Sequence, residues 1–202
     1  MNVLVVSASR SGSSYVSERL KDSNNIDYNL YEAFTIALER SNSKPRYYTE
    51  FCNNWKSTKC IAKIKIPYDW VNALGNTWLK NNLKQADVYY LSRNRVEHIL
   101  DLIAESQETS LPEDWEVEPT NIVIADPAQI IECHTQLNFV DSVIAEMKEI
   151  NNGYDITLEE IKNIAELRDY GKPKRIYNYV NELPQYQHLD VRKAVSLIIN
   201  NA

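Results

Sequence analysis

Glycine and cysteine are scarce in this sequence of 202 residues. It has only 4 Gly and 7 Pro, with 44% hydrophobic and 25% charged residues, which excludes collagen-like or intrinsically disordered character. The 3 cysteines (Cys52, Cys60 and Cys133) are odd in number and lack C-x-x-C spacing, which speaks against a disulfide framework and a structural zinc site. We therefore expect reduced thiols and a single domain over residues 1–202.

Long apolar runs and an excess of positive charge are also missing. The apolar start at residues 3–6 meets Ser7 and Arg10 too early for a signal peptide or a membrane span. We therefore expect a cytoplasmic protein, and the high Asn and Ile content hints at an AT-rich genome such as a bacteriophage's. The formal net charge of −6 disfavours general nucleic-acid binding, so an anionic ligand would need a local site.

Strand and helix patterns alternate along the chain. Segments rich in β-branched or aromatic residues predict strands at residues 3–6, 60–66, 88–91 and 122–124. Apolar spacing and capping signals predict helices at residues 15–20, 95–103, 127–150, 158–167 and 191–199. This alternation predicts an α/β fold with a mostly parallel central sheet flanked by helices. Residues 105–120 are interpreted as an acidic loop or lid.

The segment after the first predicted strand is a small-residue loop that leads into a helix. The free N–H groups of a first helical turn and the helix dipole form an oxyanion site that fits phosphate or sulfate. The Walker pattern G-x-x-x-x-G-K-[ST] is half present, because Ser7 replaces its first Gly, Gly12 keeps the second and Ser13 replaces the lysine. The missing lysine argues against an ordinary ATPase, and Arg10 supplies the positive charge instead.

This loop matches the pattern [KR]-S-G-[ST]-[ST] at every position from residue 10 to residue 14. It therefore resembles the 5'-phosphosulfate loop of sulfotransferases that use 3'-phosphoadenosine 5'-phosphosulfate, whose bacterial and phage branch commonly has the Arg-Ser-Gly-Ser form. The resemblance implies a P-loop NTPase-like three-layer sandwich. It also implies that the cofactor is bound by Ser9, Arg10, Ser11, Gly12, Ser13, Ser14 and Tyr15. The alternative is a helix-start loop that is merely rich in serine caps.

A second segment, residues 90–95, looks like the first half of a family signature that begins with Y-L-x-R-N-P, and it implies that Arg93 binds the 3'-phosphate of the cofactor. The family also carries a serine eight or nine residues later. This sequence has Asp101 and Leu102 there, and a carboxylate would repel a phosphate unless it turned away. Alternatively, Arg93 is a solvated helix-start charge, paired like its neighbour Arg95 with an acidic side chain of the same helix.

A third segment, residues 63–67, looks like the K-T-H-L-P strand of cytosolic sulfotransferases, with Lys65 in place of their catalytic histidine. Lys63 and Lys65 project from the same side of a strand because side chains alternate. The alternative is an edge strand with a solvated lysine face. Candidates for a general base are Glu32, Asp69 and His98. The basic stretch at residues 168–175 either covers the nucleotide or links two helices.

The resemblance implies metal-independent transfer of a sulfuryl group from 3'-phosphoadenosine 5'-phosphosulfate to a small-molecule or carbohydrate acceptor. The reaction would act on a hydroxyl or amine and leave adenosine 3',5'-bisphosphate, with Arg10 and Lys65 as the catalytic residues. Two alternatives stay open. One is a P-loop nucleotide-binding protein or small kinase with Asp126 as its magnesium carboxylate. The other is a catalytically decayed binding protein of the same fold.

Overall fold

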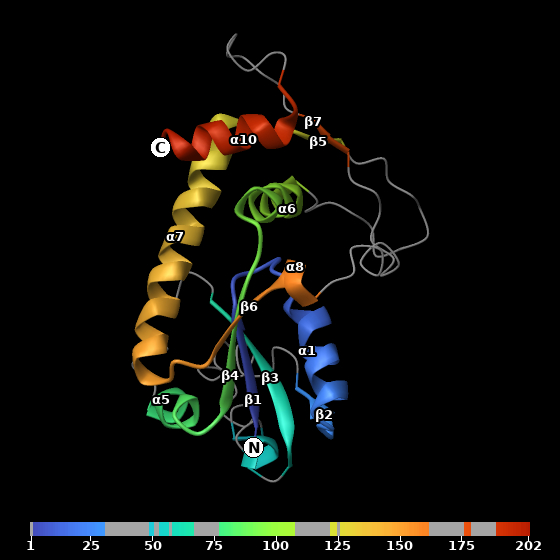
Figure 1. Cartoon of the computed structure of the whole chain (residues 1–202), viewed down its shortest axis with the longest axis vertical. Helices are drawn as coiled ribbons and strands as arrows, with labels where there is room; N and C mark the ends of the chain where they lie inside the picture. The colour runs from blue at the N-terminus through green and yellow to red at the C-terminus, as the bar shows by residue number, and fades with distance from the viewer. Residues whose placement is uncertain are drawn as a thin grey trace. The chain divides into compact units, whose positions relative to one another are not determined.

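The strand β1 (Val3–Ser7) lies at the centre of the molecule's main sheet, and all of its residues are buried. In the computed structural model it pairs in parallel with β3 (Cys60–Lys65) on one side and β4 (Asp87–Ser92) on the other. The strands β2 (Tyr28–Asn29) and β6 (Tyr154–Thr157) complete a five-stranded parallel sheet in the order β2-β3-β1-β4-β6 (Figure 1). The buried, β-branched sequence of β1 thus forms the doubly covered strand that the sequence predicts.

The structure describes residues 2–30, 49–50, 53–56, 58–66, 77–107, 122–124, 126–161, 176–178 and 189–202. The chain divides into two compact units. The first comprises Met1–Ser92 and Phe139–Ile161, and the second comprises Arg93–Asn138 and Lys162–Ala202. The five-stranded sheet lies in the first unit. The single domain expected over residues 1–202 stays a prediction.

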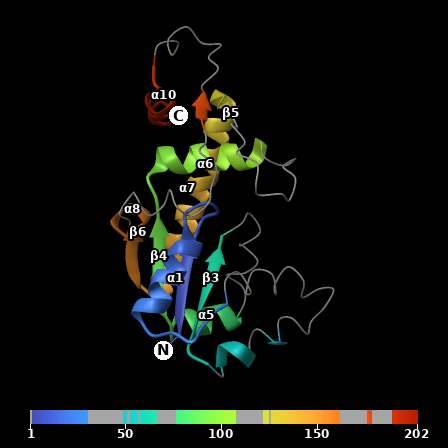
Figure 2. The ribbon, with the colours of Figure 1, turned by 90° about the vertical axis from the view of Figure 1, so that its right-hand side faces the viewer.

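Helices flank both faces of the sheet in the first unit. The helix α1 (Ser13–Ser23) packs on one face, and the C-terminal end of α7 (Pro127–Ile150) lies behind the opposite face (Figure 2). There the Tyr90 hydroxyl donates to the Asn151 carbonyl at 2.7 Å, and the Asn151 amide donates to the last carbonyl of α5 (Thr77–Leu83) at 2.5 Å. The predicted α/β class is confirmed, and the layers are consistent with a three-layer sandwich.

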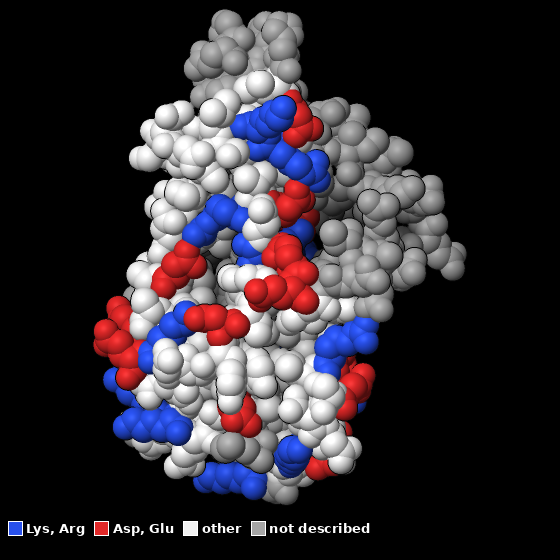
Figure 3. Space-filling view, viewed as in Figure 1, with Lys and Arg blue, Asp and Glu red and all other residues white. Residues whose placement is uncertain are grey.

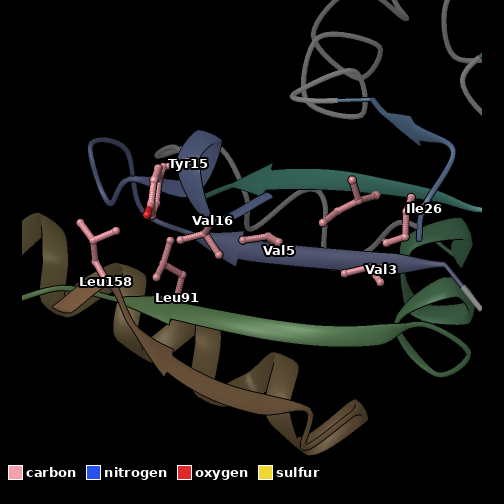
Figure 4. Close-up of a cluster of buried hydrophobic side chains, with 8 residues drawn as sticks. Val3, Val5, Tyr15, Val16, Ile26, Leu91 and Leu158 are labelled. Atoms are coloured by element: carbon pink, nitrogen blue, oxygen red, sulfur yellow. The ribbon is translucent and has the colours of Figure 1, made fainter. Parts of the chain in front are cut away.

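An apolar cluster fills the space between α1 and the sheet (Figure 4). It includes Val16 of α1 and Leu158, the first residue of α8 (Leu158–Ile161). The buried members of the cluster are Val3, Val5, Tyr15, Val16, Ile26, Ile61, Leu91 and Leu158. Because the members come from six separate stretches of chain, this cluster fixes the start of α1 against both β4 and α8.

The second unit contains two helices and a small parallel sheet. Its complete elements are α6 (Arg95–Gln107), β5 (Ile122–Ile124), β7 (Ile176–Asn178) and α10 (Val191–Asn200). The Asp190 carboxylate caps α10 by accepting from the N–H group of Arg192 at 2.9 Å. The side chain of Arg192 pairs with Glu97, which joins α10 to α6.

The predicted strands and helices are confirmed wherever the structure describes them, with one correction and several additions. The acidic loop predicted from residue 105 is wrong at its start, because α6 continues to Gln107; residues 108–120 lie outside the described residues. The helix predicted at 158–167 is confirmed for α8, and its remainder lies outside them. The sequence patterns missed α5 and the short strands β2, β6 and β7.

Charged side chains of both signs are mixed on the surface in Figure 3. One such pair joins Lys148 of α7 to Asp155 of β6, with 2.5 Å between Nζ and Oδ1. Among the described residues, no helix combines the length and the apolar character needed to cross a membrane.

Candidate anion-binding site

The turn between β1 and α1 has an unusual backbone. Arg10 has a φ of 58° and Gly12 a φ of 85°, both in the left-handed region that favours glycine. Gly12 is the N-cap of α1, and its carbonyl accepts the first helical hydrogen bond, from the N–H of Val16 at 3.2 Å. Glycine brings no capping side chain, and the N–H groups of residues 13–15 have no acceptor within the helix. These groups are the donors that an anion uses at a helix N-terminus.

The turn lies at the carboxyl end of β1, where the direction of the strand connections reverses. Ligands of parallel α/β sheets bind at such places. The connection after β1 leads toward the β2 edge, whereas the connections after β3 and β4 lead toward the β6 edge. Right-handed crossovers place such connections on opposite faces, as Figure 2 shows for α1 and the end of α7. In parallel α/β sheets, ligands bind outside the carboxyl ends of the strands at such a reversal.

Lys63 reaches the turn from the neighbouring strand β3. The register pairs Val5 with Lys63 and Ser7 with Lys65, so both lysines lie on the α1 face of the sheet. Lys63 is only 2% exposed, and its Nζ donates to the Ser14 Oγ at 2.7 Å. The alternative of an edge strand with a solvated lysine face is therefore wrong, because β3 lies inside the sheet and Lys63 is buried.

Lys65, the expected catalytic residue, is half-buried at the carboxyl end of β3. The backbone N–H of Ile66 donates to the Ser7 carbonyl at 2.9 Å, which ties the end of β3 to the end of β1. Lys65 therefore lies at the same edge of the sheet as the turn. Sequence alternation alone predicts that the two lysines share a face, and the structure adds that Lys63 is the one that contacts the turn.

Two serine hydroxyls beside the turn are deeply buried. Ser7 is 0% exposed and Ser11 is 1% exposed, and neither Oγ has a hydrogen-bond partner among the described residues. A buried polar group without a partner costs about 1–3 kcal/mol. Of the other residues in the predicted cofactor loop, Ser13 and Tyr15 are buried and Ser9 is half-buried.

A small network of hydrogen bonds holds the first turn of α1 against the end of β2. The Ser17 hydroxyl donates to the Ser14 carbonyl at 2.9 Å, and the Asn29 amide donates to Ser17 Oγ at 3.0 Å. Asn29 also donates to the Glu18 carboxylate at 2.7 Å. The end of β2 thus holds the beginning of α1 in place.

Arg93, the expected 3'-phosphate ligand, belongs to the second unit and is engaged within it. Its Nη1 donates to the carboxylate of Asp101, and the two side chains are 16% and 18% exposed. The carboxylate therefore faces the guanidinium instead of turning away. The Asn94 Oδ1 caps α6 by accepting from the N–H of Val96 at 3.1 Å. The alternative was a solvated Arg93 paired with an acidic side chain of the following helix. The pairing is confirmed, but the two side chains are mostly buried instead of solvated.

The remaining candidates are the possible general bases, the basic stretch and the possible magnesium ligand. His98 is buried on α6, whereas Glu32, Asp69 and the basic stretch at 168–175 lie outside the described residues. Asp126, the possible magnesium carboxylate, is the N-cap of α7, with Oδ1 accepting from the N–H groups of residues 128 and 129 at 2.7 and 3.1 Å.

Two of the cysteines are free, as expected. Cys60 is buried and Cys133 is half-buried, and burial raises the pKa of each thiol to about 11. At neutral pH both are therefore protonated and poor nucleophiles. Cys52 lies outside the described residues.

Two comparisons with known proteins found no match for this chain. No protein-family model matches the chain, and no curated protein matches it. The features that indicate a function are therefore the loop sequence, the backbone of the turn and the buried lysine beside it.

Proposed function

We propose that the chain is a sulfotransferase-like enzyme, which transfers a sulfuryl group from 3'-phosphoadenosine 5'-phosphosulfate to a hydroxyl or amine. The observation that carries this proposal is the hydrogen bond from buried Lys63 to Ser14 at the start of α1. It adds a second cationic side chain beside a turn that already contains Arg10 and helix N–H groups with no acceptor inside the helix. Such a combination suits a group with several negatively charged oxygens. A P-loop-like fold is part of the same proposal.

The polar atoms around the turn support a ligand that only accepts hydrogen bonds. The buried hydroxyls of Ser7 and Ser11 have no acceptor among the described residues, and phosphate and sulfate oxygens are acceptors. The Ser14 oxygen accepts from Lys63, which leaves its own O–H for donation to a ligand. A bound phosphosulfate would therefore satisfy donors that the described residues leave over.

The chain's own part in the reaction would be binding and electrostatic stabilisation. The cofactor, when bound, supplies an activated sulfuryl group. Arg10 and the N–H groups of the turn would hold its 5'-phosphate and sulfuryl oxygens. Lys63 and Lys65, on one face of β3, would stabilise negative charge on the departing oxygen. Preorganised charges of this kind contribute most of the catalysis in related phosphoryl transfers.

The pairing of Arg93 with Asp101 modifies the proposal. A 3'-phosphate would have to replace the carboxylate as the partner of the guanidinium, or share it against the repulsion of two negative charges. We therefore expect the 3'-phosphate to contribute less to affinity here than a free arginine would allow.

The kinase alternative depends on Asp126, the only obvious candidate for a magnesium ligand in the sequence. One oxygen of that carboxylate caps α7 through two backbone N–H groups, which accounts for the residue without a metal. The buried cation at Ser14 would suit an anion with or without magnesium. The structure therefore gives the kinase alternative less support than the sulfotransferase.

Thermal-shift titrations test the proposal. Adenosine 3',5'-bisphosphate without magnesium should raise the melting temperature by roughly 5–10 °C at a hundredfold excess over its Kd. An increase with ATP that requires magnesium would favour the kinase, and no increase with either would favour the non-enzymatic protein. Transfer of radiolabelled sulfate from the cofactor to a panel of hydroxyl acceptors then tests catalysis.

A further inference from the structure

We infer that Leu158 is a positioning residue for the turn at residues 8–12, an inference whose functional consequence rests on the proposed function. A Cβ atom on Gly12 would lie 2.7 Å from Leu158 Cδ1 and 2.8 Å from Cδ2. The tip of the Leu158 side chain therefore occupies the space that any larger residue at position 12 would need. Leu158 is 2% exposed, so this contact is made in the interior.

Leu158 is itself held firmly in place. It follows β6 directly, and the last residue of β6, Thr157, pairs in register with Ser92 of β4. A capping box fixes the start of α8: the Thr157 N–H donates to the Glu160 carboxylate at 2.9 Å, and the Glu160 N–H donates to the Thr157 hydroxyl at 3.2 Å. In Figure 4, Leu158 lies at the same end of the apolar cluster as Tyr15 and Leu91.

The backbone of the turn explains why such a contact matters. Arg10 is not a glycine and has a φ of 58° two residues before Gly12, and strained backbone persists only where surrounding packing determines it. Leu158 supplies that packing directly against Gly12. Without it, the turn would sample other conformations, and a ligand would have to order the turn as it binds.

Leu158→Ala is the principal variant, with Leu158→Val as a milder version in case the first does not fold. Leu158→Met is the conservative variant. Ile26→Ala is the matched control, because Ile26 belongs to the same cluster, is 5% exposed and lies at the opposite end in Figure 4. Hydrogen–deuterium exchange of the peptide that covers residues 8–15 is measured first. The Kd for adenosine 3',5'-bisphosphate follows.

Leu158→Ala or Leu158→Val should speed hydrogen–deuterium exchange in residues 8–15 at least tenfold relative to Ile26→Ala. The comparison is made at the same temperature difference below the melting temperature of each variant. Leu158→Met should stay within threefold of the wild type. The Kd for the bisphosphate should rise at least tenfold for Leu158→Ala and remain unchanged for Ile26→Ala. Exchange equal to that of the control would overturn the inference. If the wild type binds no bisphosphate, the proposed function fails, while the exchange experiment still decides the role of Leu158.

A double-mutant cycle checks the contact itself. Gly12→Ala should impair the turn through both its φ and the collision with Leu158. In the Leu158→Ala background the collision is absent. Gly12→Ala should therefore speed hydrogen–deuterium exchange in residues 8–15 by a smaller factor there than it does in the wild type. Equal factors in both backgrounds would show that the two residues are not coupled, and would contradict the inference.

Discussion

The amine of Lys63 donates to the Ser14 hydroxyl at 2.7 Å, although the two residues are 49 positions apart in the sequence. Ser14 belongs to the first turn of α1, where the helix dipole is positive. The positive end of the helix dipole repels the amine, and an anion bound between the two would attract both. Functional sites commonly contain such locally unfavourable arrangements.

The first prediction concerns Lys63. Lys63→Met should raise the Kd for adenosine 3',5'-bisphosphate at least tenfold, because a cation and its hydrogen bond to Ser14 are lost. Lys84→Met removes an equal charge from an exposed residue before β4 and should leave the Kd unchanged. A destabilised Lys63→Met variant with normal affinity would assign the lysine a structural role.

The second prediction separates the side chain of Arg10 from its backbone. Arg10→Ala and Arg10→Gly both remove the guanidinium, so both should abolish bisphosphate binding in calorimetric titrations. Arg10 has a φ of 58°, which glycine adopts without cost, so Arg10→Gly should be the more stable variant by about 1 kcal/mol. Retained affinity in either variant would remove Arg10 from the site.

The third prediction concerns the partner of Arg93. Asp101→Ser should remove the carboxylate that faces the guanidinium and so strengthen binding of the bisphosphate, while the affinity for adenosine 5'-monophosphate stays unchanged. The broken ion pair should lower the free energy of unfolding by about 1–3 kcal/mol. Glu97→Gln breaks the neighbouring pair with Arg192 and serves as the control. Equal affinities of Asp101→Ser and the wild type would mean that Arg93 does not meet the 3'-phosphate.

The fourth prediction concerns acid stability at the start of α8. Backbone and side-chain hydrogen bonds from Thr157 hold the pKa of the exposed Glu160 carboxyl below its usual value. A lowered pKa adds stability at pH values above the unfolded pKa of about 4.3 and loses it as the pH falls through the folded value.

The wild type should therefore be more stable than Glu160→Gln at pH 6, and the two melting temperatures should converge below about pH 4. A difference between wild type and Glu160→Gln that does not depend on pH would contradict the assignment.

The elements that sequence predicts well are those with strong local signals. The apolar run of β1 and the N-caps at Asp126 and Asp190 mark their elements clearly. The strand β6 lacks such a signal, since Tyr154 and Asp155 are exposed and only register with β4 makes the segment a strand. The strand β2 contains two residues, which is too short for any periodicity.

The candidate site divides in the same way. The loop at residues 9–14 and the shared face of Lys63 and Lys65 follow from local sequence. The contacts of Lys63 with Ser14 and of Leu158 with Gly12 do not, because each joins distant segments that only the sheet order brings together. The pairing of Arg93 with Asp101 is within reach of sequence, since an ion pair of Arg93 with an acidic side chain of the following helix is one of the alternatives that the sequence leaves open.

Both outer strands of the five-stranded sheet are brief: β2 has two residues and β6 has four. A long exposed edge strand can pair with another chain through its unpaired N–H and C=O groups. Short edge strands offer fewer such groups and so limit aggregation. The apolar strands β3, β1 and β4 are thereby shielded from intermolecular pairing. A truncated chain that ends before residue 154 would uncover the whole length of β4, and we expect such a fragment to aggregate.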